Sequence, residues 1–422
     1  MSAAARPAGT GCEAVVVGAG MIGVCCALFL QRDGYSVTLI DRQGPGEGAS
    51  YGNGSMLTCE AVVPIQTPGI VWRVPAMLLD PLGPLRVRWG YLPRLMPWLA
   101  RFLLESRWPR VEAASIALAR LLDGALADFD PLLRQAGAEA MVRRTGFLMV
   151  YESEAAFRRA APLIALQRRR GVEMEVLDAR TLESREPNLA PIFARGILYP
   201  EVAQALDVFR LVQVLAESFV AQGGTLRREE VRDFAFASER KVAAVVTDRG
   251  RHACDAVVVA AGAWSRPLAR RLASDTLLDT ERGYSVLLPD PGVAPNTPLY
   301  STERGIVVSP MAIGLRVAGT VELGGLAAPP DWRRAEVLLA VARRWLPGLR
   351  TEGGERWMGF RPSMPDSVPV ISGSPRYGNA FFAFGHGHGG IGLGARTGRL
   401  IADLVSGRAP GIDMAPYRVD RF

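Results

Sequence analysis

The sequence predicts a mixed α/β (α+β) fold, in which a Rossmann-like domain is joined to a second domain built on a mixed antiparallel sheet. Two observations carry this prediction. A buried strand, a glycine turn, an apolar helix and a second strand follow one another between residues 14 and 41, the order of a parallel βαβ unit. Later, SVLL, GIVVSP and GLRVAGTVEL alternate as antiparallel strands do. With 422 residues, 49% of them hydrophobic, the chain can bury the cores of both domains.

The glycine turn of the βαβ unit, GAGMIG at residues 18–23, has the pattern of a dinucleotide-binding site. Gly18 permits the tight turn, Gly20 lets the backbone approach a pyrophosphate, and Gly23 allows close packing of the helix. The free N–H groups at the start of the helix attract the anion. Within this complete strand, turn and helix context, the pattern strongly indicates dinucleotide binding.

Asp41 ends the second strand, eighteen residues after Gly23. An acidic side chain at this place accepts hydrogen bonds from ribose hydroxyls, which favours a cofactor with an unmodified 2′-hydroxyl over NADP. FAD and NAD share these features. The small, donor-rich loop after Asp41, the strand that ends at Gly262 and the glycine-rich segment 385–394 offer three separate sets of backbone donors, which favours the longer FAD.

The chain resembles the D-amino-acid oxidase and dehydrogenase superfamily of FAD enzymes, which includes members that oxidise glycine, sarcosine and dimethylglycine. The resemblance rests on GAGMIG with Asp41, GASYGNGS, the segment 196–224, VVVAAGAWS, RWMGFRPSMPDSVPVI at 356–371 and GHGHGGIGLG. These motifs follow in order over nearly the whole chain. They are most similar to bacterial D-amino acid dehydrogenases, with relatives that act on D-hydroxyproline.

The resemblance implies that the C-terminal glycine loop runs beside the flavin, with its helix N-terminus directed at the cofactor. Together with the glycine turn, it gives the expected cofactor-binding residues: Gly18, Gly20, Met21, Ile22, Gly23, Asp41, Arg42, Ser50, Asn53, Gly54, Ser55, Val231, Ala261, Gly262, Trp264, Gly387, His388, Gly389, Gly390 and Ile391.

The same loop holds His386 and His388, two of the three histidines of the chain. A metal site is not expected, because the third histidine, His252, lies in a predicted hairpin strand and a zinc site needs more ligands. His386 or His388 is expected to line the site, orienting substrate or tuning the flavin; the alternative is that they merely fill the loop.

The chemistry that the resemblance implies is dehydrogenation of a C–N bond, with hydride transfer from the α-carbon to flavin N5 and later hydrolysis of the imine. Arg361 in GFRPSMPD matches the arginine that grips the substrate carboxylate in this family, and a planar guanidinium can do so bidentately. Tyr284 in RGYSVLL matches a region where the family places a tyrosine hydroxyl near that carboxylate; the alternative is a core aromatic residue of a strand. Arg361, Tyr284 and His386 are therefore the expected catalytic residues.

The expected substrates are small D-amino acids, D-hydroxyproline or N-substituted glycines. FAD should be bound noncovalently, because GEGASYGNGS and GFRPSMPDS lack the His and Cys that attach the flavin in other relatives. The single lysine, Lys241, is not expected beside the flavin, where a lysine promotes reaction with oxygen in the sarcosine oxidase type. This favours a dehydrogenase that passes electrons to a quinone or carrier protein. Two alternatives stay open: an NAD-dependent dehydrogenase, and an electron-relay flavoprotein subunit of a larger complex.

The split motifs place the FAD-binding domain at residues 1–60, 195–265 and 355–422, and the substrate-binding domain at 61–194 and 266–354.

Surface charge and location follow from the composition. The net charge of +7 comes from arginines spread along the chain, with no nucleic-acid-binding motif, so no nucleic-acid partner is expected. We expect a cytoplasmic protein, because no apolar run reaches the length of a membrane span and the first residues do not form a signal peptide. The segment from Ile70 to Arg110 holds four of the eight tryptophans and seven arginines. It is expected to cap the substrate pocket, and the less favoured alternative is peripheral contact with the inner face of the membrane.

Overall fold

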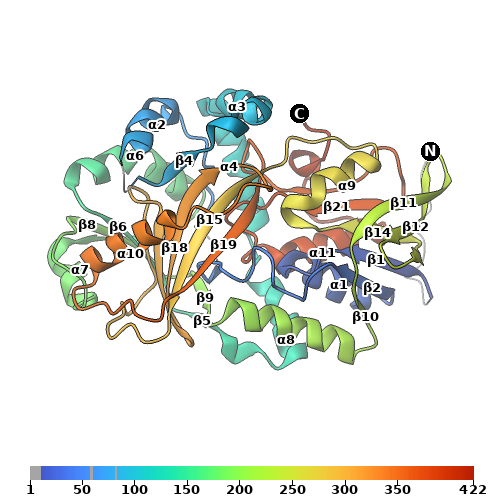
Figure 1. The fold of residues 1–422 in the computed structure, drawn as a ribbon, viewed down its shortest axis with the longest axis horizontal. Helices are drawn as coiled ribbons and strands as arrows, with labels where there is room; N and C mark the ends of the chain where they lie inside the picture. Colours follow the sequence, from blue (N-terminus) through green and yellow to red (C-terminus); the bar gives the residue numbers. More distant parts are fainter. Residues whose placement is uncertain (1–10, 58–59, 81–82) are drawn as a thin grey trace.

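The computed structural model describes residues 11–57, 60–80 and 83–422. Two sheets dominate it, one in each half of the molecule, with helices packed around them (Figure 1). The mixed α/β prediction is confirmed.

The first sheet is built from the βαβ unit and from strands that come much later in the chain. Its order in the described part of the chain is β10-β2-β1-β14-β21-β20, and all neighbours are parallel except β20 with β21. The strands are β1 (Glu13–Val17), β2 (Ser36–Asp41), β10 (Thr225–Arg228), β14 (Ala256–Val259), β20 (Val370–Gly373) and β21 (Ala380–Phe384).

Both faces of this sheet are covered, and its inner strands β1, β14 and β21 are accordingly almost wholly apolar. One face packs against α1 (Met21–Arg32), α8 (Val208–Ala221) and α11 (Gly394–Val405). The other packs against α9 (Ser265–Arg271) and a three-stranded antiparallel sheet of β11 (Val231–Ser238), β12 (Lys241–Thr247) and β13 (Arg251–Ala253).

The second large sheet is mixed and mainly antiparallel, in the order β19-β15-β18-β17-β16-β6-β8-β7, with β4 parallel to β18. Its strands are β4 (Leu85–Val87), β6 (Phe147–Tyr151), β7 (Glu175–Asp178), β8 (Arg195–Tyr199), β15 (Asp279–Leu288), β16 (Leu299–Ser301), β17 (Ile306–Met311), β18 (Gly314–Leu323) and β19 (Glu355–Ser363). Helix α10 (Arg333–Trp345) packs on one face and buries alternate residues of β15 and β18 there.

The remaining elements connect the two halves. A small sheet joins β3 (Met56–Leu57), β9 (Ala203–Ala205) and β5 (Val142–Arg144). The other helices are α2 (Ile70–Leu79), α3 (Leu92–Glu105), α4 (Trp108–Leu122), α5 (Asp130–Ala136), α6 (Glu154–Arg169) and α7 (Ala179–Arg185). Among the described residues, none of the helices is both long and apolar enough to cross a membrane.

Strand pairing differs from the expected domain ranges at two places. Strands β8 and β19 fall inside ranges assigned to the FAD-binding domain, but they pair with β6 and β15 of the mixed sheet. Sequence could not place these strands, because their partners are distant in the chain. The division into two domains stays a prediction.

Candidate active site

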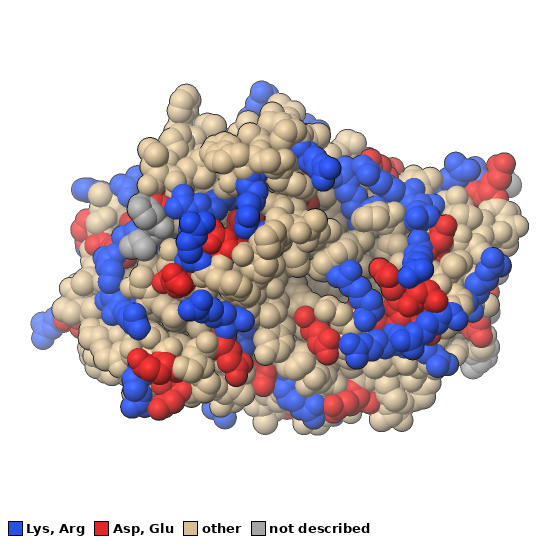
Figure 2. Space-filling view, viewed as in Figure 1, with Lys and Arg blue, Asp and Glu red and all other residues tan. Residues whose placement is uncertain are grey.

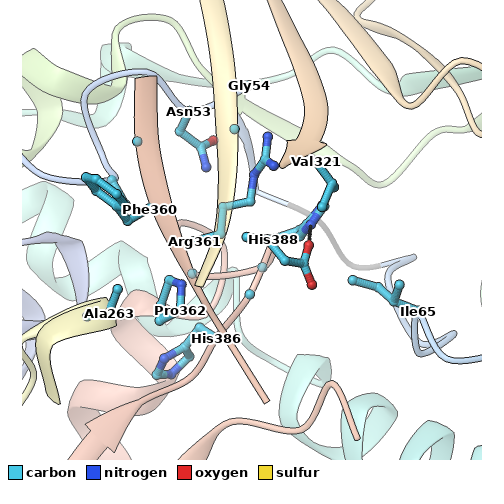
Figure 3. A pocket seen from close by; sticks show the side chains of 18 of the residues that line it. Asn53, Gly54, Ile65, Ala263, Val321, Phe360, Arg361, Pro362, His386 and His388 are labelled. Atoms are coloured by element: carbon cyan, nitrogen blue, oxygen red, sulfur yellow. Dashed lines mark hydrogen bonds and ion pairs between the residues drawn. The ribbon is translucent and has the colours of Figure 1, made fainter. Parts of the chain in front are cut away.

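A cavity of about 1500 Å³ extends between the two large sheets. Figure 3 shows side chains that line it, among them Asn53, Arg361 and His388. It brings together the glycine turn before α1, the loop after β2, the segment after β14 and the loop before α11. All the expected site residues border this cavity except Gly23 and Ser55.

The glycine turn has the geometry that the sequence predicts. Gly18 has a φ of +108°, and a Cβ there would lie 2.4 Å from the carbonyl oxygen of Ala260. A Cβ at Gly23 would lie 1.7 Å from the carbonyl oxygen of Gly18, so Gly23 serves packing behind the cavity. At Gly20, a Cβ would meet only Ser50 Oγ, at 3.6 Å. Gly20 therefore leaves open space at the N-terminus of α1, where a pyrophosphate fits.

Asp41 braces this turn. Its Oδ2 accepts a hydrogen bond from the backbone N–H of Ala19 (2.7 Å), and its Oδ1 accepts one from Gln43 (2.8 Å). Burial raises the pKa of the Asp41 carboxyl, although these two bonds oppose the rise. Each carboxylate oxygen keeps a lone pair for a ribose hydroxyl. Nearby, the Arg42 guanidinium lies 4.0 Å from the centre of the Trp264 ring.

The loop after β2 contributes fewer groups than expected. Ser50 Oγ accepts a hydrogen bond from Met21 N (3.2 Å) at the start of α1, and Asn53 and Gly54 border the cavity. Ser55 is fully buried, and its Oγ accepts a hydrogen bond from Gln204 (3.0 Å). We therefore assign Ser55 to the packing of β3 against β9 and not to cofactor binding.

The C-terminal glycine loop is held at the cavity by two helices in close contact. A Cβ at Gly398 of α11 would lie 2.7 Å from backbone atoms of Cys25 in α1, and one at Gly394 would lie 2.6 Å from Met21. The two helices therefore begin next to each other. Both N-termini, with Gly20 and Ile391, border the same cavity. Such an arrangement stabilises negative charge.

His386 is a buried part of this loop. Its Nε2 is 2.9 Å from Thr397 Oγ1 in α11. Burial lowers the pKa of His386 to about 3, so the ring is neutral at physiological pH. The backbone also holds the loop, because Gly387 N donates to the carbonyl of Pro362 (2.7 Å), next to Arg361.

Arg361 lies on β19, and its side chain extends into the cavity (Figure 3). Its guanidinium donates to the carbonyl oxygens of Thr320 (2.8 Å) and Gly319 (3.4 Å) and forms no ion pair with the described residues. It lies against Gly283, where a Cβ would be only 2.2 Å from it. Burial lowers the pKa of Arg361, against the opposing effect of Glu281. A guanidinium has five N–H donors, so this one has donors left for a carboxylate.

Tyr284 borders the cavity, but its hydroxyl already has two partners, so its expected role near the substrate carboxylate stays a prediction. Its hydroxyl donates to the Glu322 carboxylate and accepts from the backbone N–H of Asp331 (2.8 Å). Successive residues of a strand point to opposite faces, so Gly283 faces Arg361 while Tyr284 packs toward α10. This position favours the alternative interpretation of Tyr284, a core aromatic residue of a strand.

Tyr300 and Glu281 are site residues that sequence reasoning missed. Both border the cavity and interact electrostatically with Arg361. Tyr300 is on β16, and burial raises its pKa. The sequence signal that could have indicated Glu281 is an acidic residue at the start of the strand that continues into SVLL.

Glu281 pairs with His388. His388 Nε2 lies 2.9 Å from Glu281 Oε2, and the contact is drawn as a dashed line in Figure 3. The Glu281 side chain is 7% exposed, and the His388 side chain is 47% exposed. Burial would raise the pKa of Glu281, but the hydrogen bond from His388, the charge that this ring carries when protonated and the Arg361 guanidinium hold it below its usual range. The cavity therefore contains an ionised carboxylate next to an accessible imidazole.

Comparison with known proteins agrees with this site. Residues 13–404 match the family described as FAD dependent oxidoreductase. A D-amino-acid oxidase of Bradyrhizobium diazoefficiens is 40% identical over 420 residues, which cover 98% of this chain and 99% of that protein. D-amino acid dehydrogenase 2 of Ralstonia nicotianae is 34% identical over 97% of this chain and 100% of its own. The crystal structure of a glycine oxidase from Geobacillus kaustophilus has a TM-score of 0.73 at 22% identity, covering 98% of this chain and 100% of that one.

The family match settles the choice of cofactor in favour of FAD and removes the NAD-dependent alternative. The open glycine turn, the braced Asp41 and the two adjacent helix N-termini fit this cofactor. This chain belongs to the FAD dependent oxidoreductase family.

Proposed function

We propose that the protein dehydrogenates the C–N bond of a small amino acid: a D-amino acid, D-hydroxyproline or an N-substituted glycine. The observation that carries the proposal is the Arg361 guanidinium, which extends into the cavity near the flavin loops without an acidic partner among the described residues. Glu281 acts on this desolvated guanidinium from the neighbouring strand without forming an ion pair with it, so a substrate carboxylate would be its direct partner. The names of the relatives, D-amino-acid oxidase and D-amino acid dehydrogenase, support the same substrate class.

In this proposal the protein mainly orients the substrate. FAD supplies the hydride acceptor, flavin N5. Arg361, fixed by two backbone carbonyls and by the lack of a side chain at Gly283, holds the carboxylate so that the α-carbon has one position. Tyr300 is the tyrosine placed to assist Arg361. His386 stays neutral and anchors the glycine loop to α11.

An anaerobic screen of flavin bleaching tests the proposal. The purified yellow protein is mixed with D-amino acids, D-proline derivatives and N-methyl amino acids without oxygen. We expect at least one of them to bleach the flavin absorbance. Bleaching by none of them, with dithionite still able to reduce the flavin, would refute the proposal and favour the electron-relay alternative.

We further propose that the electron acceptor is a quinone or a carrier protein. Lys241, the single lysine, is exposed on β12 and does not border the cavity. The cavity also reaches apolar residues of α2 and α3, including Met77 and Leu99, through which an apolar acceptor could approach. We expect rapid turnover with a soluble quinone and slow oxygen uptake. Rapid oxygen uptake would instead match the relative named an oxidase.

The face formed by α2, α3 and the start of α4 supports membrane contact near the part of the cavity that reaches these helices. It exposes Val71, Trp72, Leu79, Trp89, Met96, Leu103, Leu104 and Trp108. Trp98, by contrast, is buried and donates to the Ser363 carbonyl (3.1 Å). Arg94, Arg107 and Arg110 are exposed on the same segment, and Figure 2 shows mainly uncharged atoms at the top of the molecule. This combination suits an anionic lipid surface.

Flotation with vesicles tests this contact. We expect the protein to float with vesicles that contain phosphatidylglycerol and to be released by high salt. The double variant Trp72→Ser, Trp89→Ser should bind less while keeping its FAD. No binding of the unmodified protein to anionic vesicles at low salt would contradict the proposal.

A further inference from the structure

Before an amino acid can lose hydride from its α-carbon, its ammonium group must lose a proton, because the nitrogen lone pair forms the new C=N bond. We propose that His388 accepts this proton and that Glu281 positions and stabilises the resulting imidazolium. This inference rests on the proposed function. It assigns an acid–base role to a histidine for which the sequence predicted cofactor binding, substrate orientation or flavin tuning.

The hydrogen bond fixes which ring nitrogen is free. An ionised carboxylate can only accept hydrogen bonds, so Nε2 of His388 carries the hydrogen that it donates to Glu281. In the neutral ring, Nδ1 is then the unprotonated nitrogen. It makes no hydrogen bond to any described residue, and the half-exposed side chain borders the cavity. Nδ1 is therefore a base without a partner.

The pair lies beside the proposed carboxylate anchor. Glu281 and Arg361 are opposite each other on β15 and β19, and Gly283, which supports the guanidinium, is two residues from Glu281 on the same face of the strand. Figure 3 draws His388 and Arg361 among the side chains that line the same cavity, and Glu281 interacts electrostatically with both. An amino acid carries its carboxylate and its ammonium group on one carbon. Binding of the carboxylate by Arg361 thus brings the ammonium group near the pair.

The charges agree with a proton acceptor at this position. Glu281 from β15 bonds to His388, Arg361 from β19 and Tyr300 from β16 interact electrostatically with Glu281, and His386 is two residues away in the same loop. Arg361 is neutralised by the substrate carboxylate, which leaves Glu281 to balance an imidazolium. His386 cannot replace His388, because it is buried and its Nε2 is bonded to Thr397.

The step balances without an oxidant. The proton moves from the substrate –NH3+ group to Nδ1 of His388, which becomes an imidazolium paired with the Glu281 carboxylate. The nitrogen keeps the electron pair of the broken N–H bond, and the amine is then neutral. No electron reaches the flavin in this step.

The first test uses 2-aminoisobutyrate, which has the ammonium and carboxylate groups but no α-hydrogen to lose. The chain has three histidines, so ¹⁵N-histidine spectra of the FAD-loaded protein contain few signals. At pH 8 we expect this compound to convert the His388 ring to imidazolium, and isobutyrate, which lacks the ammonium group, not to do so. The Glu281→Gln variant should lose the response. Binding of 2-aminoisobutyrate with a neutral His388 ring would overturn the inference.

The second test follows the pH dependence of flavin reduction under anaerobic conditions. For His388→Asn we expect kcat/KM about 100-fold below that of the unmodified protein at pH 7, the size of a general-base contribution. The difference should shrink as the pH passes the pKa of the free substrate ammonium, above which solvent has already removed the proton. His252→Asn is the matched control: His252 also pairs with a glutamate, Glu229 at 2.7 Å, but it does not border the cavity, and no change is expected.

The outcomes separate the two proposals. If no amino acid reduces the flavin of the unmodified protein, the proposed function fails and this inference fails with it. If reduction occurs but the ratio between the unmodified protein and His388→Asn is the same at every pH, the function stands and His388 has only a structural role.

Discussion

Replacing Arg361 by lysine keeps the positive charge of the carboxylate anchor but removes its fork of donors. In the structure this fork is divided: two N–H groups are used by the carbonyls of Thr320 and Gly319, and the others face the cavity. A lysine ammonium has three donors on a single atom, so it cannot bind both carbonyls and both carboxylate oxygens. Loss of one charge-assisted hydrogen bond costs about 1.5–3 kcal/mol, which corresponds to a roughly 10- to 150-fold lower kcat/KM.

The assay is stopped-flow flavin reduction by the best amino acid from the anaerobic screen, with FAD content measured in parallel. Arg361→Lys should retain FAD, and the amine that matches the substrate but lacks a carboxylate should react equally with both proteins. Arg356→Lys is the matched control, because Arg356 lies on the same strand, is largely exposed and makes only a long contact of 3.7 Å with Glu336. Equal losses for the amino acid and the amine, or no loss for either, would show that Arg361 is structural.

Three further predictions concern the cofactor and the loop. Gly20→Val should give soluble, colourless protein, because the extended backbone (φ −72°, ψ 178°) accepts any residue and the new side chain fills only the cavity. Gly378→Ala, at an open position, is the control. A yellow Gly20→Val protein would contradict the placement of the pyrophosphate at this turn. Acid denaturation should release all the flavin into the supernatant, and flavin left on the precipitate would disprove noncovalent binding. His386 should make the free energy of unfolding depend on pH, because its pKa of about 3 in the folded protein is below its value in the unfolded chain. As the pH falls below about 6.5, only the unfolded chain gains a proton at this residue. The free energy of unfolding should therefore decrease by about 2 kcal/mol between pH 8 and pH 5. His386→Gln should lack this loss in urea denaturation, and an equal loss in both proteins would refute the assignment.

The parts of the fold that the sequence predicted well depend on residues close together in the chain. The turn from Gly18 to Gly23 and the end of β2 at Asp41 form within a single βαβ unit, so spacing alone predicts that Gly23 packs against Gly18, although it does not predict that Gly18 also meets Ala260. Family resemblance then added Arg361, which could not have been chosen among so many arginines by its residue type.

The rest depends on register between distant strands. Tyr284 and Gly283 are neighbours, and only the pairing of β15 with β19 and β18 decides that the glycine faces Arg361 while the tyrosine packs toward α10. The same register brings Glu281 to the cavity face, where His388 comes from a loop 107 residues later. The tryptophans of the segment 70–110 likewise divide into buried Trp98 and exposed neighbours for reasons of tertiary packing.

The two histidines of GHGHGGIGLG are two residues apart in the same glycine loop, but their rings differ in environment. His386 borders the cavity but is buried, which keeps its ring neutral, and Thr397 fixes the ring. His388 is turned toward the cavity, where an ionised carboxylate supports a positive ring. Gly387 lies between them with a φ of +51°, a left-handed backbone conformation that glycine adopts easily because it has no Cβ. In the proposed mechanism the glycines of this motif would serve two purposes: they would bring backbone donors to the flavin, and they would allow His386 to hold the loop while His388 faces the substrate.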